Sequence, residues 1–201
     1  MQQRRATDQI KVVGFDPSLR NWGIAKGVLI PNDGSIIITH LDVIRPFISE
    51  AKGMRPNAKD VSAAEQLAVA AWNAMEGAQA VFIEVPHGSQ SSRAMASYGV
   101  CVGVIGALAT SGIPMYQVSE AEVKKATTAN REAKKEDTIA WAMSNHPEAP
   151  WPMKTALGIS SVVAGRAEHM ADAIGAIYAG VASKPFKQVI ALLTSNQRIT
   201  P

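Results

Sequence analysis

The 201-residue sequence has one cysteine, few aromatic residues and no long uninterrupted apolar run. Because Cys101 is the only cysteine, an intrachain disulfide and a cysteine-based zinc cluster are both excluded. Its apolar neighbours favour a buried small hydrophobe over a reactive thiol. The apolar stretches are interrupted well short of the ~20 residues that a bilayer span needs. No apolar segment follows the arginines near the N-terminus, so no signal peptide is predicted. We therefore expect a cytoplasmic protein with no membrane partner.

The composition is that of an ordinary globular domain, with 47% hydrophobic and 18% charged residues. A chain of 201 residues fits one domain with a core and a short arm or tail. The net charge of +3 is a mild preference for an anionic partner and does not identify one. Internal repeats and low-complexity segments are absent from the sequence.

The pattern of apolar residues predicts three strands followed by alternating helices and strands. Residues 10–15, 21–30 and 35–44 are apolar or β-branched and are separated by turn residues, which predicts an antiparallel meander. Further strands are expected at 80–84 and 113–118. Helices are expected at 61–77, 92–108, 120–126, 134–145 and, as the last one, 167–182, which follows a loop rich in glycine and serine. This order predicts a single α/β layer structure.

Four candidate metal ligands fall on these elements. Asp16 ends the first strand, Glu84 ends a later one, and His169 and Asp172 lie three apart in the last expected helix, on one face. A carboxylate in that apolar helix is costly without a partner, and converging carboxylates repel one another. A pair of Mg²⁺ or Mn²⁺ ions would relieve this repulsion and could activate water for phosphodiester hydrolysis.

Each of these residues also has a plainer interpretation. Asp16 before Pro17 could start a turn, Glu84 could be a solvated acid at a strand end, and His169 could be a core histidine. The sequence alone leaves these alternatives open.

Four motifs, in order, resemble the RuvC-type Holliday junction resolvases of the ribonuclease H-like superfamily. Residues 14–23 read Gly-Phe-Asp-Pro-Ser-Leu-Arg-Asn-Trp-Gly, and residues 82–84 read Phe-Ile-Glu. The third motif is a segment with Lys124 and Lys135 eleven positions apart, and the fourth is His-Met-Ala-Asp-Ala-Ile at 169–174. Residues 91–103, with Gly99 and Gly103, are similar to the helix that follows the second acid. Together these motifs span most of residues 10–180.

The resemblance implies a mixed five-stranded sheet flanked by helices over residues 10–182, with a basic arm at 1–9 and a tail at 183–201. It further implies a homodimeric crossover junction endodeoxyribonuclease that makes paired symmetric nicks in four-way or branched DNA and leaves 3′-hydroxyl and 5′-phosphate ends. Asp16, Glu84, His169 and Asp172 would hold two Mg²⁺ or Mn²⁺ ions, and Lys124 and Lys135 would act near the cut phosphate. The residues expected to contact DNA are His87, Ser91, Arg93, Lys124, Lys125, Asn130, Arg131, Lys134 and Lys135. A solvated basic face is the alternative for the lysines.

The chain departs from the family pattern after the second acid. His87 stands where family members commonly carry an aromatic residue, and it could stack on a base or be an ordinary loop residue. Residues 46–59 and the segment after 183 also diverge, which suits a phage or mobile-element protein acting in the host cytoplasm. Glu168 is a further acid, for which a solvent-facing position is expected. The helix at 92–108 could pack at a dimer interface or against the sheet.

Three other functions share some of these sequence features. An actin-like ATPase shares the strand-Asp opening, but its second phosphate loop and adenosine motif are missing from the sequence, and 201 residues are too few for its two lobes. A nuclease for RNA–DNA hybrids or for RNA processing would lack the lysine segment in this form. A catalytically inactive module for branched DNA would not need four metal ligands.

Overall fold

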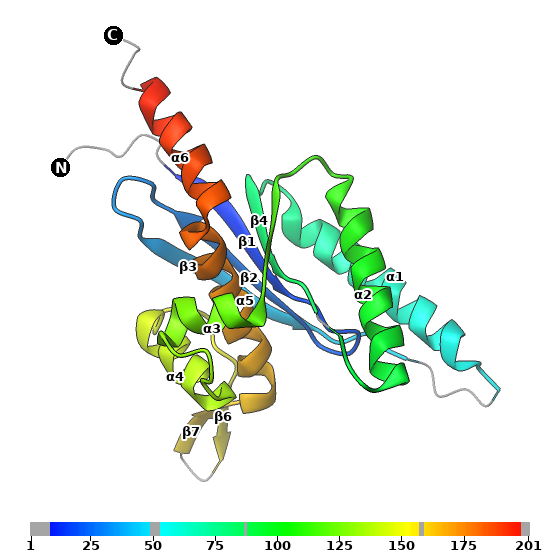
Figure 1. Ribbon diagram of the computed structural model, residues 1–201. Helices are drawn as coiled ribbons and strands as arrows, with labels where there is room; N and C mark the ends of the chain where they lie inside the picture. Colours follow the sequence, from blue (N-terminus) through cyan, green and yellow to red (C-terminus); the bar gives the residue numbers. More distant parts are fainter. Residues whose placement is uncertain (1–8, 49–52, 87, 157–158, 198–201) are drawn as a thin grey trace.

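A five-stranded mixed sheet forms the centre of the protein (Figure 1). The computed structural model describes residues 9–48, 53–86, 88–156 and 159–197. The strands are β1 (Ile10–Asp16), β2 (Trp22–Leu29), β3 (Ile36–Ile44), β4 (Ala80–Glu84) and β5 (Met115–Val118), in the spatial order β3-β2-β1-β4-β5. The first three strands form the predicted antiparallel meander. Strands β4 and β5 extend the sheet in parallel with β1, because helices connect them.

Helices cover both faces of the sheet, and the alternation of side chains along β1 separates two cores. Val13 and Phe15 point to the layer of α1 (Pro56–Met75) and α2 (Ser92–Ala109). Val12 points to the other layer, which is built around α5 (Ala164–Ala182). That layer also contains α3 (Glu120–Thr128), α4 (Lys135–Asn145) and α6 (Lys184–Gln197). The predicted mixed sheet flanked by helices is therefore confirmed.

Helix α2 is the helix expected at 92–108, and it is rich in apolar residues. By length and composition alone it could cross a membrane, although a helix of a folded core meets the same criterion. Its inner face packs on the sheet through buried Cys101, Val104, Ile105 and Leu108. This packing confirms the buried position expected for Cys101.

Three elements were not predicted, two strands and one helix. The segment taken for a loop holds a hairpin of β6 (Met153–Ala156) and β7 (Ile159–Val162), closed at its base by a bond from Val163 N to Pro152 O of 2.7 Å. Helix α5 was expected to be the last helix, but α6 follows it. Phe186 holds α6 in place through edge-on ring contacts with Phe82 and Tyr116. Such contacts between distant residues leave no periodic signal in the sequence.

Candidate active site

Two of the predicted acids lie side by side at one edge of the sheet. Strands β1 and β4 are parallel neighbours, and Phe15 pairs with Ile83. The next residue on each strand is an acid, Asp16 on β1 and Glu84 on β4. The carboxyl ends of parallel strands meet at the same edge, so the strand pairing itself brings these carboxylates together.

Helix α5 lies unusually close to the sheet because two strand glycines leave room for its backbone. A Cβ atom added to Gly14 would lie 2.0 Å from the carbonyl oxygen of Ala173. A Cβ atom added to Gly23 would lie 2.1 Å from the carbonyl oxygen of His169. Any larger residue would force the helix away from the sheet. Since Gly23 pairs with Asp16, this contact sets the height of His169 above that acid.

The close approach of α5 to the sheet brings His169 into direct contact with Asp16. Nδ1 of His169 lies 2.7 Å from Oδ2 of Asp16, and the two side chains are only 18% and 16% exposed. This hydrogen bond raises the pKa of His169 above its ordinary value, against the opposing effect of burial. The predicted shared face of His169 and Asp172 is thus turned towards the sheet edge that carries Asp16.

Burial and mutual repulsion disfavour the ionised forms of the carboxyl groups around Asp16. Burial first, and then the charges of Asp16 and Asp172, raise the pKa of Glu84 to about 8. Burial and the charges of Asp16 and Glu168 likewise raise the pKa of Asp172. Three carboxylates and one imidazole are donors that suit Mg²⁺ or Mn²⁺, and a cation would relieve their repulsion. Within the described residues, however, no three His, Cys, Asp or Glu side chains already stand in metal-binding geometry.

The predicted lysines face the same acids. A pocket of about 360 Å³ brings Lys124 and Lys135 together with Glu84 and Asp172. Lys124 Nζ pairs with Glu120 at 2.6 Å, and Lys135 Nζ pairs with Glu168. The second pair shows that Glu168 faces the site and is only 23% exposed, whereas a solvent-facing position was expected.

Comparison with solved structures identifies the architecture. A Thermus thermophilus RuvC bound to a Holliday junction substrate matches with a TM-score of 0.61 and 16% sequence identity, over 89% of this chain and 96% of that chain. A second T. thermophilus RuvC structure matches with a TM-score of 0.59 and 17% identity, over 90% of this chain and 97% of that chain. The fold is that of RuvC. No protein-family model and no curated protein matches the sequence.

On this RuvC fold, the structure adds one acid that the sequence analysis missed. Glu120 follows β5, whose carboxyl end lies at the same sheet edge as Asp16 and Glu84. It lines both the lysine pocket and a neighbouring pocket of about 330 Å³ that contains Asp16, Ser18 and Glu84. Its position directly after a predicted strand was the available signal, but a helix start also favours an acid there.

The other residues predicted to contact DNA differ in their exposure and in the partners they already have. Arg93 makes a bidentate pair with buried Asp60, with two bonds of 2.6 Å, so its guanidinium already has a structural partner. Ser91 caps α2 by accepting a bond from Ala94 N. Lys125 is exposed on α3, and Asn130, Arg131 and Lys134 are exposed on the loop before α4. His87 lies outside the described residues. These DNA contacts stay predictions.

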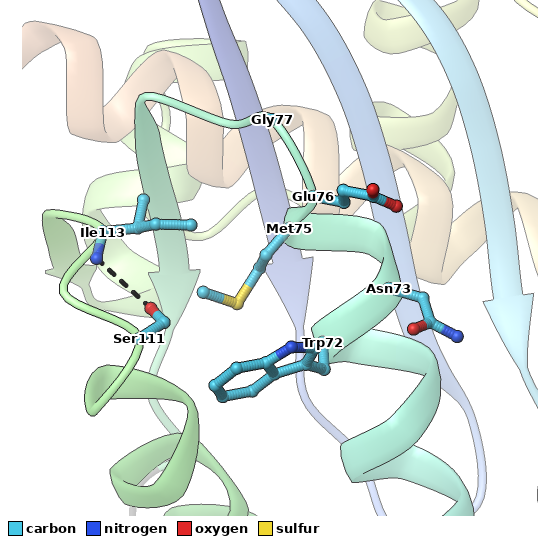
Figure 2. A pocket seen from close by; sticks show the side chains of 7 residues that line it. All are labelled: Trp72, Asn73, Met75, Glu76, Gly77, Ser111 and Ile113. Atoms are coloured by element: carbon cyan, nitrogen blue, oxygen red, sulfur yellow. Dashed lines mark hydrogen bonds between the residues drawn. The ribbon is translucent and has the colours of Figure 1, made fainter.

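Another pocket lies away from the acids. Figure 2 shows a pocket of about 450 Å³ where the carboxyl end of α1 approaches the segment between α2 and β5. Its lining includes Trp72, Met75, Glu76 and Ile113. This is the sheet edge where β4 begins, opposite the edge where β1 and β4 end in acids. A single carboxylate in its lining gives no basis for metal chemistry.

Proposed function

We propose that this protein is a divalent-metal-dependent endonuclease that resolves four-way or otherwise branched DNA by paired symmetric nicks. The observation that carries the proposal is the meeting of Asp16, Glu84, His169 and Asp172 at one sheet edge, beside two lysines. The RuvC fold supports it, and one RuvC of that fold is described in complex with a Holliday junction substrate. Cytoplasmic location, in the host if the protein is phage-encoded, is part of the proposal.

The acidic residues would hold Mg²⁺ or Mn²⁺, with two ions in the full site. When bound, the metal supplies Lewis-acid activation of water and of the phosphodiester. Asp16 already accepts a bond from the half-buried imidazole of His169, which orients both side chains. Burial and neighbouring acids destabilise the ionised forms of Glu84 and Asp172. A bound cation would stabilise these ionised forms, so both carboxylates favour metal binding.

Lys124 and Lys135 would bind the phosphates next to the cut. Each now pairs with an acid, Glu120 or Glu168, and each lines the pocket that contains Glu84. A DNA phosphate could replace these carboxylate partners while the lysine keeps an anionic neighbour. Lysines held this way would stabilise the charge that develops on the phosphate during hydrolysis.

A homodimer would supply the second nick, and α2 offers a surface for it. The inner face of α2 packs on the sheet, while Gly99, Val102 and Gly103 on its outer face are exposed. Added Cβ atoms at Gly99 and Gly103 would meet no described atom within 4 Å. Small residues permit close helix approach, and a twofold axis through α2 would relate two sites symmetrically.

The proposal is tested by cleavage of a labelled synthetic four-way junction in Mg²⁺ and in Mn²⁺. Linear duplex and an RNA–DNA hybrid serve as control substrates, and Asp16→Asn and Asp172→Asn as control proteins. We expect paired symmetric nicks in the junction alone, lost in both variants while junction binding persists. Binding without any cut would favour an inactive branched-DNA module. Preferred cleavage of the hybrid would instead indicate a ribonuclease H activity.

A further inference from the structure

Two arginines outside the predicted site meet where β3 ends and α5 begins. Arg45 follows β3, and its Nη2 donates to the carbonyl oxygen of Gly165 at 3.2 Å. Arg166, in the first turn of α5, donates from Nη2 to Oδ1 of Asp42 at 3.5 Å. The two guanidinium groups therefore belong to one junction between strand and helix.

The positive charge of this pair is only partly compensated. A guanidinium carries five N–H donors, and the contacts above use one donor of each arginine in the part of the chain that the structure describes. The contact with Asp42 is long, and the same Asp42 oxygen also accepts a bond from Val43 N at 2.7 Å. Arg166 Nε is buried and has no hydrogen-bond partner among the described residues. Arg45 is exposed and the Arg166 side chain is 40% exposed, so both can reach a ligand.

The pair stands at the same edge of the sheet as the carboxylates. Arg166 precedes His169 by three residues, so it lies on the same face of α5, roughly 5 Å along the helix axis. Ile44, the last residue of β3, pairs with Trp22, and the next residue of β2 pairs with Asp16. Strand β3 is thus two strands from β1, or roughly 10 Å across the sheet. Lys124 and Lys135 border the site from the β4 side instead.

We propose that Arg45 and Arg166 bind a backbone phosphate of the DNA strand next to the cut site. The strand would then run along the sheet edge from the lysines, past the carboxylates, to the end of β3. The fork of a guanidinium matches the oxygens of a phosphate, and such a contact positions DNA without reading its sequence. This inference rests on the proposed function, because it assigns a further contact to the same substrate.

The first test measures how junction binding depends on salt. Arg45→Gln and Arg166→Gln are compared with Lys187→Gln, which removes one exposed positive charge from α6. Binding to a labelled four-way junction and to linear duplex is measured in chelator between 50 and 200 mM salt. Each arginine variant is expected to bind both DNAs more weakly. The slope of log affinity against log salt should flatten by up to about one, because one phosphate contact contributes about 0.9. Arg166→Lys keeps the charge and should retain most of the slope.

The second test separates a phosphate contact from a purely structural brace. Asp42→Asn removes the carboxylate charge facing Arg166, whereas Asp33→Asn removes a matched charge in the turn between β2 and β3. A phosphate site predicts tighter DNA binding for Asp42→Asn alone, and a brace predicts lower thermal stability without tighter binding. If wild type binds and cuts DNA while the arginine variants match Lys187→Gln, this inference is wrong and the proposed function stands. If wild type binds neither DNA, both are wrong. If Arg166→Gln fails to fold, Arg45→Gln and Asp42→Asn still distinguish a phosphate contact from a structural brace.

Discussion

Replacement of Gly23 by alanine should disable the site while leaving the fold in place. The added Cβ would lie 2.1 Å from the carbonyl oxygen of His169 and 2.7 Å from its carbonyl carbon. Ordinary contact begins near 3.4 Å, so α5 must retreat by more than about 1 Å, since the clash involves backbone and not a flexible side chain. The bond of 2.7 Å between His169 and Asp16 would then stretch beyond hydrogen-bonding distance.

Two quantities should change in Gly23→Ala. Overpacking of this kind costs about 1–3 kcal/mol of stability, and a displacement of ~1 Å at a catalytic group can cost about 100-fold in rate. Junction cleavage per folded molecule should therefore fall by about two orders of magnitude. In metal-free protein, the imidazole of His169 should titrate closer to its ordinary pKa, because the bond to Asp16 that raises the pKa is lost. Proton NMR of the four histidines measures this independently of nuclease activity.

Gly27→Ala is the matched control. Gly27 lies on the same strand, and its added Cβ would meet the carbonyl oxygen of Ile37 at 2.7 Å, roughly 13 Å along β2 from Gly23. It should lose stability but keep wild-type cleavage per folded molecule and an unchanged titration of His169. The reasoning is refuted if Gly23→Ala keeps both the rate and the raised pKa, or if Gly27→Ala loses them equally.

Three further predictions concern charge and burial. In chelator, wild type should lose stability as pH rises from about 4.5 to about 8, because the Glu84 carboxyl ionises in the unfolded chain while burial raises its folded pKa to about 8. Glu84→Gln should reduce this loss, with the part due to the raised pKa of Asp172 remaining, and should melt higher than wild type at pH 8; an equal slope in both proteins would contradict the assignment. Arg93→Gln should lower the free energy of unfolding at pH 7, measured by urea denaturation, because buried Asp60 loses its bidentate partner. The difference should shrink progressively as pH falls below the ordinary Asp value of 3.8, because Arg93 lowers the pKa of Asp60 and the folded carboxylate is protonated only below that value; a difference that does not change with pH in this acidic range would show that packing and not charge matters. Native protein should resist thiol alkylation at pH 8, since burial raises the pKa of Cys101 to about 11, and labelling at the rate of unfolded protein would disprove this.

The sequence by itself predicted the strands of the sheet and indicated most residues of the candidate site. Local patterns sufficed for this, because apolar alternation, turn residues and an acid at a strand end are all written in neighbouring positions. Asp16 and Glu84 were each recognised at the end of a predicted strand, whereas their meeting at one edge depends on the parallel pairing of β1 with β4. The three-residue spacing of His169 and Asp172 placed them on one helix face.

Only the tertiary structure decided which groups touch, because those contacts join residues far apart in the chain. The close approach of α5 depends on Gly14 and Gly23, whose role is visible only when the helix lies against them. The bond from Arg93 to Asp60 spans 33 residues, and that from His169 to Asp16 spans 153. Helix α6 likewise owes its position to Phe186 packing against Phe82 and Tyr116. The periodicity of apolar residues in the sequence indicates which face of a helix or strand a residue occupies. The residue that it contacts on another element is determined by tertiary packing.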